Sequence, residues 1–213
     1  MNKLAIACNP QNYGGRRTQA VKYIVVHYTA GDGDTAENNG LYFRREAVGS
    51  SAHWFVDEEN ALLSVPEDHV AWHCGAAQYV HPDCRNGNSI GVELCSRMDP
   101  GGEYYFPPAI LENGAELVRE LMAKYGVTPE RVLRHYDVSG KKCPAPLVEA
   151  GQWKEFLTMI TRYQKTEEMP LWAQETVQKL MNQGVLQGNG QGLDLSHDMV
   201  RMLVILDRRG VFG

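Results

Sequence analysis

Apolar and polar positions alternate in patterns that predict several β-strands in the larger, N-terminal part of the chain. Residues 23–28 form an apolar run rich in β-branched side chains, which is typical of a buried central strand. Residues 53–56 and 61–65 predict a hairpin around the loop 57–60. Residues 89–95 alternate, with apolar side chains on one face and a single carboxylate on the other. These segments favour a central sheet.

Helices are predicted between and after these strands from apolar positions spaced three or four residues apart. Residues 36–46 follow Thr35, whose hydroxyl can cap the start of a helix. Residues 109–125 carry the clearest helical period and end at Gly126, a residue type that favours helix C-termini. Residues 153–160 predict a third helix. Strands that alternate with helices indicate the α/β class, here a mixed central β-sheet flanked by helices.

Three further segments carry weaker patterns. Residues 1–20 predict an irregular arm, because an Asn-Pro step and paired glycines interrupt any period. Residues 66–89 predict long loops, and residues 131–136 predict a short strand or the end of one.

The last part of the chain predicts a separate helical module. Residues 164–169 are polar and are typical of a linker, and Pro170 suits the first turn of a new helix. A turn is expected at residues 188–192, and Ser196 is expected to cap a second helix.

These patterns set the predicted domain boundaries. We expect an α/β domain over residues 1–163, a linker over 164–169 and a small all-α module over 170–213. The module contains the apolar run 202–206, and chains of roughly 40 residues rarely bury such a run alone. The module is therefore expected either to dock on the larger domain or to self-associate.

Composition excludes two classes of partner. With 21 Lys and Arg against 26 Asp and Glu, the net charge of −5 is not the positive charge that tight nucleic-acid binding needs. No apolar run approaches the roughly 20 residues that span a bilayer, and the first apolar stretch is too short for a signal peptide. We therefore expect no nucleic acid, no membrane span, and synthesis in a cytoplasm without a signal peptide.

The five cysteines predict no full disulfide framework, because their number is odd and their spacing fits no metal knuckle. At least one thiol must be unpaired within the monomer. A disulfide between Cys74 and Cys84 stays open.

Three residues are candidate metal ligands. His27 ends the predicted buried strand, His135 ends a later one, and Cys143 follows in a Gly-Lys-Lys-Cys-Pro turn. Imidazole and thiolate both suit zinc, and three protein ligands with one water make an open catalytic site. Spacing alone is weak evidence, since a single histidine on an apolar strand is more often a core residue.

Five blocks in a fixed order add specificity to this interpretation. They are residues 24–30 (IVVHYTA), 51–56 (SAHWFV), 71–75 (AWHCG), 88–93 (NSIGVE), and 135–137 (HYD) followed by 141–144 (KKCP). In these blocks the chain resembles the zinc-dependent N-acetylmuramoyl-L-alanine amidases of type 2, which include phage endolysins and share a fold with peptidoglycan recognition proteins. The resemblance covers roughly residues 20–163 and implies that amidase fold.

The resemblance also implies a role for each matched residue. It makes His27, His135 and Cys143 the ligands of Zn²⁺. It makes Glu93 the acid or base and Lys141 the cation near the scissile carbonyl. The chemistry is consistent, because zinc polarises a carbonyl, a carboxylate transfers protons and a cation stabilises an oxyanion. The plainer alternatives are a solvated strand carboxylate for Glu93 and ordinary surface charge for Lys141.

The leading functional hypothesis is a phage or prophage endolysin. Such an enzyme hydrolyses the amide bond between N-acetylmuramic acid and L-alanine in peptidoglycan, is bacteriolytic, and acts on the cell wall after release. The alternatives are a cytoplasmic muropeptide-recycling amidase and a non-catalytic peptidoglycan-binding protein. Cys143 favours a lytic enzyme, because recycling amidases that resemble this fold have an aspartate at that position.

The tail adds a second, weaker resemblance. Residues 170–213 look like the short helical C-terminal modules of clostridial-type endolysins. That likeness implies binding to a bacterial cell-wall polymer or homo-oligomerisation through this module, without choosing between them.

Overall fold

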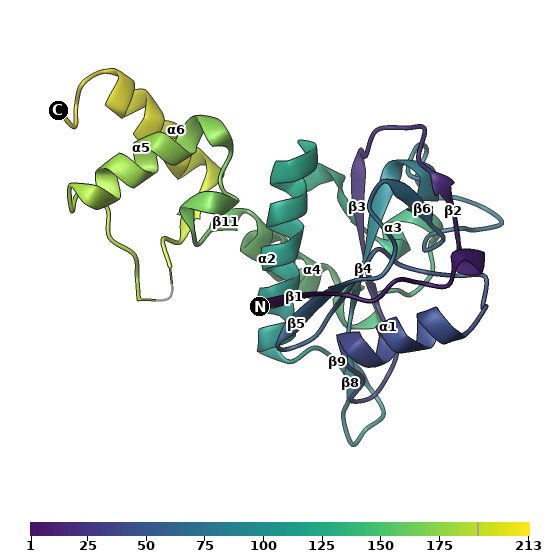
Figure 1. Ribbon diagram of the computed structural model, residues 1–213. Coiled ribbons are helices and arrows are strands. Elements are labelled where there is room, and N and C mark those ends of the chain that lie inside the picture. The colour runs from purple at the N-terminus through teal and green to yellow at the C-terminus, as the bar shows by residue number, and fades with distance from the viewer. Residues whose placement is uncertain (191) are drawn as a thin grey trace. The chain divides into compact units, whose positions relative to one another are not determined.

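The computed structural model describes residues 1–190 and 192–213 (Figure 1). The chain forms two compact units, Met1–Phe156 and Leu157–Gly213, which are described separately. The turn expected at residues 188–192 includes Gln191, which lies outside the described residues. The domain boundaries expected from the sequence stay predictions.

A six-stranded mixed sheet forms the centre of the first unit, with the order β1-β5-β4-β7-β3-β10. The strands are β1 (Asn2–Ala5), β3 (Tyr23–Tyr28), β4 (Trp54–Val56), β5 (Asn60–Leu63), β7 (Ser89–Leu94) and β10 (Val132–Arg134). Strands β4, β7, β3 and β10 run parallel, while β5 is antiparallel to β4 and β1 is parallel to β5. The predicted α/β class with a mixed sheet is confirmed.

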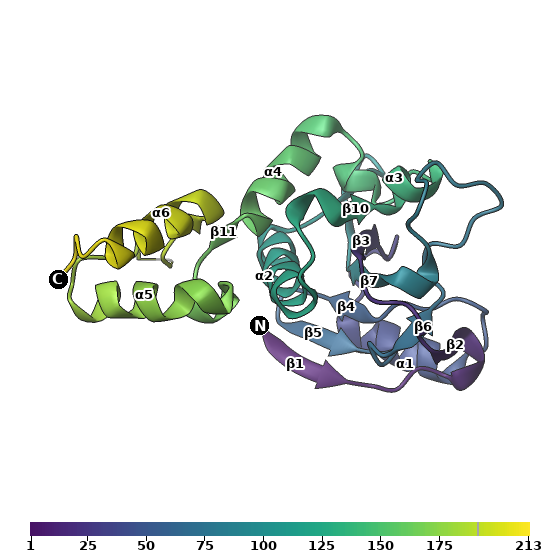
Figure 2. The same ribbon diagram turned by 90° about the horizontal axis from the view of Figure 1, so that it is seen from above.

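Helices cover both faces of this sheet (Figures 1 and 2). The helices of this part of the chain are α1 (Ala36–Arg45), α2 (Pro108–Tyr125), α3 (His135–Ser139) and α4 (Ala150–Ile160), of which residues 157–160 fall in the second unit. As predicted, Thr35 caps α1 through its hydroxyl, and α2 ends at Gly126 in the left-handed conformation.

Register pairing across the sheet shows on which face the side chains of His27 and Glu93 lie. Leu62, Phe55, Glu93 and His27 are register partners on neighbouring strands, so their side chains share a face. Helix α1 packs against Leu62 and Phe55. Helix α2 approaches Leu94 so closely that a Cβ on Gly114 would lie 2.7 Å from the leucine side chain. It therefore covers the opposite face.

Two predictions for irregular segments are wrong. Residues 1–20 contain β1, which pairs with β5 at the edge of the main sheet, and β2 (Tyr13–Arg16). Strand β2 pairs antiparallel with β6 (His69–Ala71), inside the segment expected to be loops. Strand β1 is exposed along its whole length, so no apolar period marks it, and its pairing comes from tertiary contacts.

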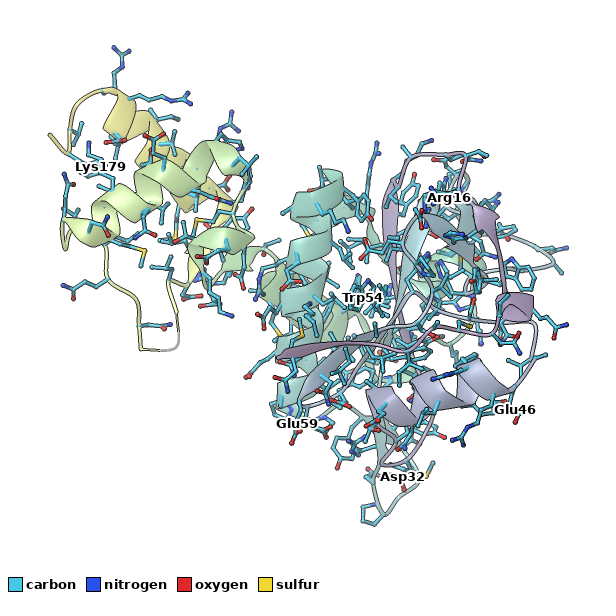
Figure 3. The ribbon with its side chains drawn as sticks, viewed as in Figure 1. Arg16, Asp32, Glu46, Trp54, Glu59 and Lys179 are labelled. Carbon is cyan, nitrogen blue, oxygen red and sulfur yellow. The ribbon has the colours of Figure 1, made fainter. Side chains whose placement is uncertain are left out.

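Short elements complete the first unit. They are the 3₁₀ helices η1 (Pro10–Asn12), η2 (Asn86–Asn88), η3 (Pro129–Arg131) and η4 (Ala145–Leu147), and the strand pair β8 (Arg97–Met98) and β9 (Tyr104–Tyr105). Trp54, labelled in Figure 3, is buried, and its indole N–H donates to the Glu67 carboxylate.

The second unit is built on two helices that pack side by side. Its elements are β11 (Arg162–Tyr163), η5 (Thr166–Glu168), α5 (Leu171–Asn182), β12 (Leu195–Ser196) and α6 (His197–Arg208). Ser196 caps α6, as predicted. Between the helices, Asp207 accepts from Thr176 and, at 2.9 Å, from Lys179, which is labelled in Figure 3. The small unit thus has its own apolar core, in which Ala173, Val177, Val200 and Val204 are buried.

No helix among the described residues is long and apolar enough to cross a membrane.

The close approach of α1 to β5 gives a stability prediction. A Cβ added to Gly40 would lie 2.8 Å from Cδ2 of the fully buried Leu62 and 3.3 Å from Cβ of Ile6. We expect Gly40→Ala to lower the free energy of unfolding by about 1–3 kcal/mol, because overpacking a filled core costs more than helix propensity gains. Gly151→Ala, with open space around it, is the control and is expected to gain about 0.5 kcal/mol. Urea titration that finds Gly40→Ala as stable as the parent protein would contradict this packing.

Candidate active site

The structure brings the three candidate metal ligands together. His27 lies at the end of β3, His135 begins α3 directly after β10, and Cys143 follows α3. All three are buried, and their ligand atoms lie within 4.8 Å of one another. On the parallel neighbours β3 and β10, Val26 lies opposite Arg134. The residue that follows each of them is a histidine, so His27 and His135 come close together. Their role as ligands stays a prediction.

The donor set fits a tetrahedral metal ion. His27 Nδ1 lies 3.6 Å from Cys143 Sγ. Zinc bonds of about 2.0 Å to nitrogen and 2.3 Å to sulfur place tetrahedral ligands roughly 3.6 Å apart. His135 Nδ1 is buried and finds no hydrogen-bond partner among the described residues, which leaves it able to bind a metal.

Arg134 fixes the segment that carries two of the three candidate ligands. Its guanidinium forms a 2.6 Å ion pair with Asp137 and donates to the carbonyl oxygens of Leu147 and Val148. The Asp137 carboxylate also accepts from the Arg134 backbone N–H at 2.8 Å, which fixes the first turn of α3. Arg134 therefore links the chain before His135 to the chain after Cys143.

Burial keeps the candidate ligands uncharged. It holds the pKa of His27 well below its usual value, with the neighbouring His73 and His135 adding to the effect. Burial, together with the nearby Lys141, lowers the pKa of His135 to about 4. It raises the pKa of the Cys143 thiol to about 12, and the nearby Glu93 acts in the same direction. Both imidazoles are thus neutral at pH 7, as metal binding requires, while the thiol must lose a proton.

Glu93 lies beside His27 on the neighbouring strand β7. Its Oε2 atom is buried without a hydrogen-bond partner among the described residues. Burial raises its pKa to about 8, against the influence of Lys141 and with a contribution from Asp34. A carboxyl group whose pKa lies near neutrality can both take and give a proton.

A cavity of about 320 Å³ opens beside these groups. His27, His135, Cys143, Glu93 and Lys141 all line it. The exposed Lys141 ammonium thus lies on the same hollow as the buried carboxyl group and the three candidate ligands. The five residues proposed from the sequence therefore form one site.

Two further histidines, His53 and His73, extend this site. The imidazole rings of His135, His27, His73 and His53 follow one another with centroid separations of 4.8, 5.1 and 5.7 Å. His73 Nδ1 lies 3.0 Å from His27 Nε2, whereas His53 Nδ1 accepts the backbone N–H of Gly91. The motif block at residues 71–75 was the available signal for His73.

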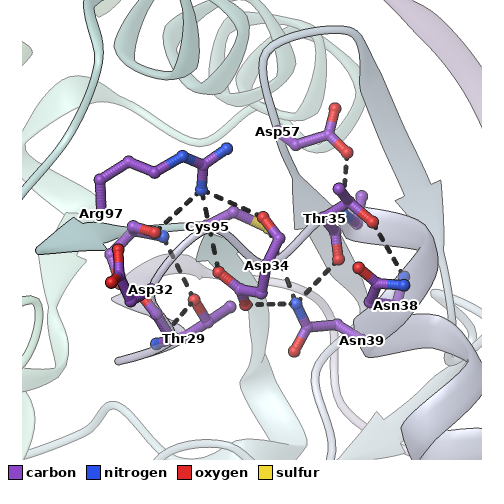
Figure 4. A network of polar contacts seen from close by, with 12 residues as sticks. Thr29, Asp32, Asp34, Thr35, Asn38, Asn39, Asp57, Cys95 and Arg97 are labelled. Carbon is purple, nitrogen blue, oxygen red and sulfur yellow. Dashed lines mark hydrogen bonds and ion pairs between the residues drawn. The ribbon is translucent and has the colours of Figure 1, made fainter.

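A polar network supports the chain segment that borders the cavity (Figure 4). Asp34 accepts from Asn39 at 2.6 Å and lies 4.0 Å from the Arg97 guanidinium, which also pairs with Glu58 at 2.6 Å. In the same segment Ala30 has a positive φ of 54°, and its carbonyl accepts from Tyr104. A non-glycine residue in this conformation costs about 1 kcal/mol or more, so these contacts hold the rim of the cavity in place.

Cys74 and Cys84 are free thiols. Both are buried in an apolar cluster with Tyr23, Val25 and Leu133, where they pack as small hydrophobic side chains.

Comparison with known proteins identifies the family. A family model described as N-acetylmuramoyl-L-alanine amidase matches residues 17–146. A probable N-acetylmuramoyl-L-alanine amidase of Bacillus licheniformis is 32% identical over 195 residues, covering 87% of this chain and 54% of that protein. The N-acetylmuramoyl-L-alanine amidase BlyA of Bacillus subtilis (strain 168) is 35% identical over 161 residues, covering 69% of this chain and 42% of that protein.

A solved structure supports the same assignment. The catalytic domain of XlyA matches with a TM-score of 0.64 at 26% identity, covering 75% of this chain and 99% of that domain. The chain belongs to the N-acetylmuramoyl-L-alanine amidase family, so the predicted family and fold are confirmed. It spans about half the length of the curated relatives it matches.

The half-buried Glu93, whose Oε2 atom is inaccessible to solvent, predicts a pH-dependent stability difference in metal-free protein. With a folded pKa of about 8 against an ordinary 4.5, the folded state keeps a proton that the unfolded state loses. Relative to Glu93→Gln, the parent protein should lose stability as pH rises from about 4.5 to 8, by roughly 2–5 kcal/mol in total. Urea unfolding at pH 5 and pH 9 measures this difference. Glu46→Gln, at an exposed position, serves as the control. An equal response of the two variants would contradict the raised pKa of Glu93.

Proposed function

We propose that this chain is a zinc amidase of the endolysin type, which hydrolyses the bond between N-acetylmuramic acid and L-alanine in peptidoglycan and so lyses bacterial cell walls. The observation that carries the proposal is the meeting of His27, His135 and Cys143 with Glu93 and Lys141 around one cavity. Membership of the amidase family supports the same reaction.

Each residue has a chemical task in this proposal. The two imidazoles and the Cys143 thiolate would hold Zn²⁺, which polarises an amide carbonyl and makes water a better nucleophile when bound. Glu93 takes a proton from the attacking water and delivers it to the leaving amine. The Lys141 ammonium stabilises negative charge that develops on the carbonyl oxygen. The cavity holds the substrate amide between these groups.

The donor set also weighs against the alternatives. A protein that only binds peptidoglycan needs neither an open metal site nor a buried carboxyl group with a raised pKa. A muropeptide-recycling enzyme would use the same chemistry, but that hypothesis assigns no role to the helical unit at the C-terminus.

The proposed site of action is the bacterial cell wall, which the protein reaches after release from the cell that makes it. We propose that residues 170–213 contribute by binding a cell-wall polymer or by homo-oligomerisation. Support comes from apolar side chains that helices α5 and α6 leave exposed in the second unit. These are Leu171, Trp172, Met181, Met199, Met202 and Ile205.

Product analysis tests the reaction. Purified peptidoglycan incubated with the native protein should release stem peptides that begin with L-alanine, detected by mass spectrometry. Cys143→Ala and chelator-treated protein should release none, because each lacks a complete metal centre. His69→Ala, a histidine outside the cavity lining, is the control and should retain activity. Full hydrolysis by Cys143→Ala without bound metal would overturn the zinc assignment.

The helical unit predicts a separable effect. Replacing Met199 and Met202 by serine should reduce sedimentation with cell walls or lower the mass in solution, while hydrolysis of soluble muropeptides stays unchanged. Both side chains are about half exposed, so the core of the unit is left intact. A serine replacement of Met98, an exposed methionine of the first unit, is the control. If wall sedimentation and solution mass are both unaltered, the exposed face of α6 has neither role.

A further inference from the structure

A chain of buried hydrogen bonds begins at His27 and ends at a backbone carbonyl. His27 Nε2 lies 3.0 Å from His73 Nδ1, and His73 Nε2 lies 3.1 Å from Ser89 Oγ. The Ser89 hydroxyl donates to the carbonyl oxygen of Arg85 at 2.7 Å. Ser89 is fully buried and His73 is 9% exposed, so bulk water does not replace these partners.

The carbonyl at the end of the chain fixes the direction of every bond. A carbonyl oxygen can only accept, so the Ser89 hydroxyl hydrogen is committed to Arg85. Ser89 Oγ then accepts from His73 Nε2–H. A neutral His73 ring consequently has a lone pair on Nδ1, which accepts from His27 Nε2–H. The remaining nitrogen of His27, Nδ1, therefore carries a lone pair, and it is the atom that lies 3.6 Å from Cys143 Sγ.

A glycine on β7, Gly91, makes room for this arrangement. A Cβ on Gly91 would lie 2.5 Å from Cγ of His73, well inside contact distance. The His73 ring therefore packs directly on the backbone of β7, two residues along from Ser89 and two from Glu93. Any larger residue at position 91 must displace the ring from its place between His27 and Ser89.

We infer that His73 is a positioning residue, which holds His27 in the tautomer that presents Nδ1 to the metal ion, and that Gly91 is required for its placement. The inference rests on the proposed metal site. His73 itself is not one of the three clustered ligands, because its Nδ1 is occupied by His27 and its Nε2 by Ser89. Partners of this kind orient a metal-bound histidine and raise its basicity.

Metal affinity gives the first test. Zn²⁺ binding to the full chain is measured by competition with a chromophoric chelator at pH 7.5. His73→Ala should weaken binding about 10–100-fold, the range typical for loss of such a partner. His73→Asn should recover most of the loss, because its amide oxygen can accept from His27 near the position of Nδ1. Wild-type affinity in His73→Ala, or equal losses in the Ala and Asn variants, would overturn the inference.

A matched glycine pair tests the packing. Gly91→Ala should weaken Zn²⁺ binding to a similar degree as His73→Ala. Gly15→Ala, where nothing lies within 4 Å of an added Cβ, should leave it unchanged. Tight binding by Gly91→Ala would show that the close approach is not needed.

The tautomers of His27 and His73 can be determined on the native protein, without any variant. Long-range ¹H–¹⁵N correlation spectra of metal-free native protein should show the protons of His27 and His73 on Nε2. A proton on Nδ1 of either ring overturns the inference even if every variant fails to fold. The outcomes also separate the two proposals. Native protein that binds no Zn²⁺ removes the proposed metal site, whereas native binding with an unaffected His73→Ala removes only the role of His73.

Discussion

The in-register pairing of parallel strands β3 and β7 is the constraint on which the site depends. It places His27 opposite Glu93, and the pairing of β3 with β10 brings His135 to the adjacent position. Because side chains alternate along a strand, a slip of one residue would turn Glu93 to the face covered by α2 and remove it from the cavity. The apolar residues that alternate with the functional ones are fully buried, so the hydrophobic core maintains this register.

The same arrangement concentrates unsatisfied polar atoms in one place. Glu93 Oε2 and His135 Nδ1 are both buried without hydrogen-bond partners among the residues described. Such atoms cost about 1–3 kcal/mol each in an ordinary interior. Both residues line the shared cavity, where the proposed substrate and metal ion would supply the missing partners. The favourable packing of the sheet thus offsets the free-energy cost of these two unsatisfied atoms.

Much of this could be predicted from the sequence, for physical reasons that differ between elements. Residues 23–28 and 109–125 combine strong periodicity with burial, and their strand and helix appear where expected. Strands β1 and β2 lie in a segment without a usable period, so their pairing could not be inferred locally. The five candidate site residues were found through motif blocks and do meet around one cavity, while their roles stay predictions. The contact between His27 and His73 joins residues far apart in the sequence, and no local pattern encodes it.

The guanidinium of Arg134 has a consequence for how the candidate metal site is assembled. By bonding to Asp137 on one side and to the Leu147 and Val148 carbonyls on the other, it closes the loop that contains His135 and Cys143. The conformational entropy cost of closing that loop is therefore met during folding, so binding of the proposed metal ion would not have to meet it. Only a rigid, forked side chain can hold both ends at once, since a lysine would offer a single point of attachment. Arg134 thus acts as a non-covalent staple that pre-organises the two candidate ligands His135 and Cys143.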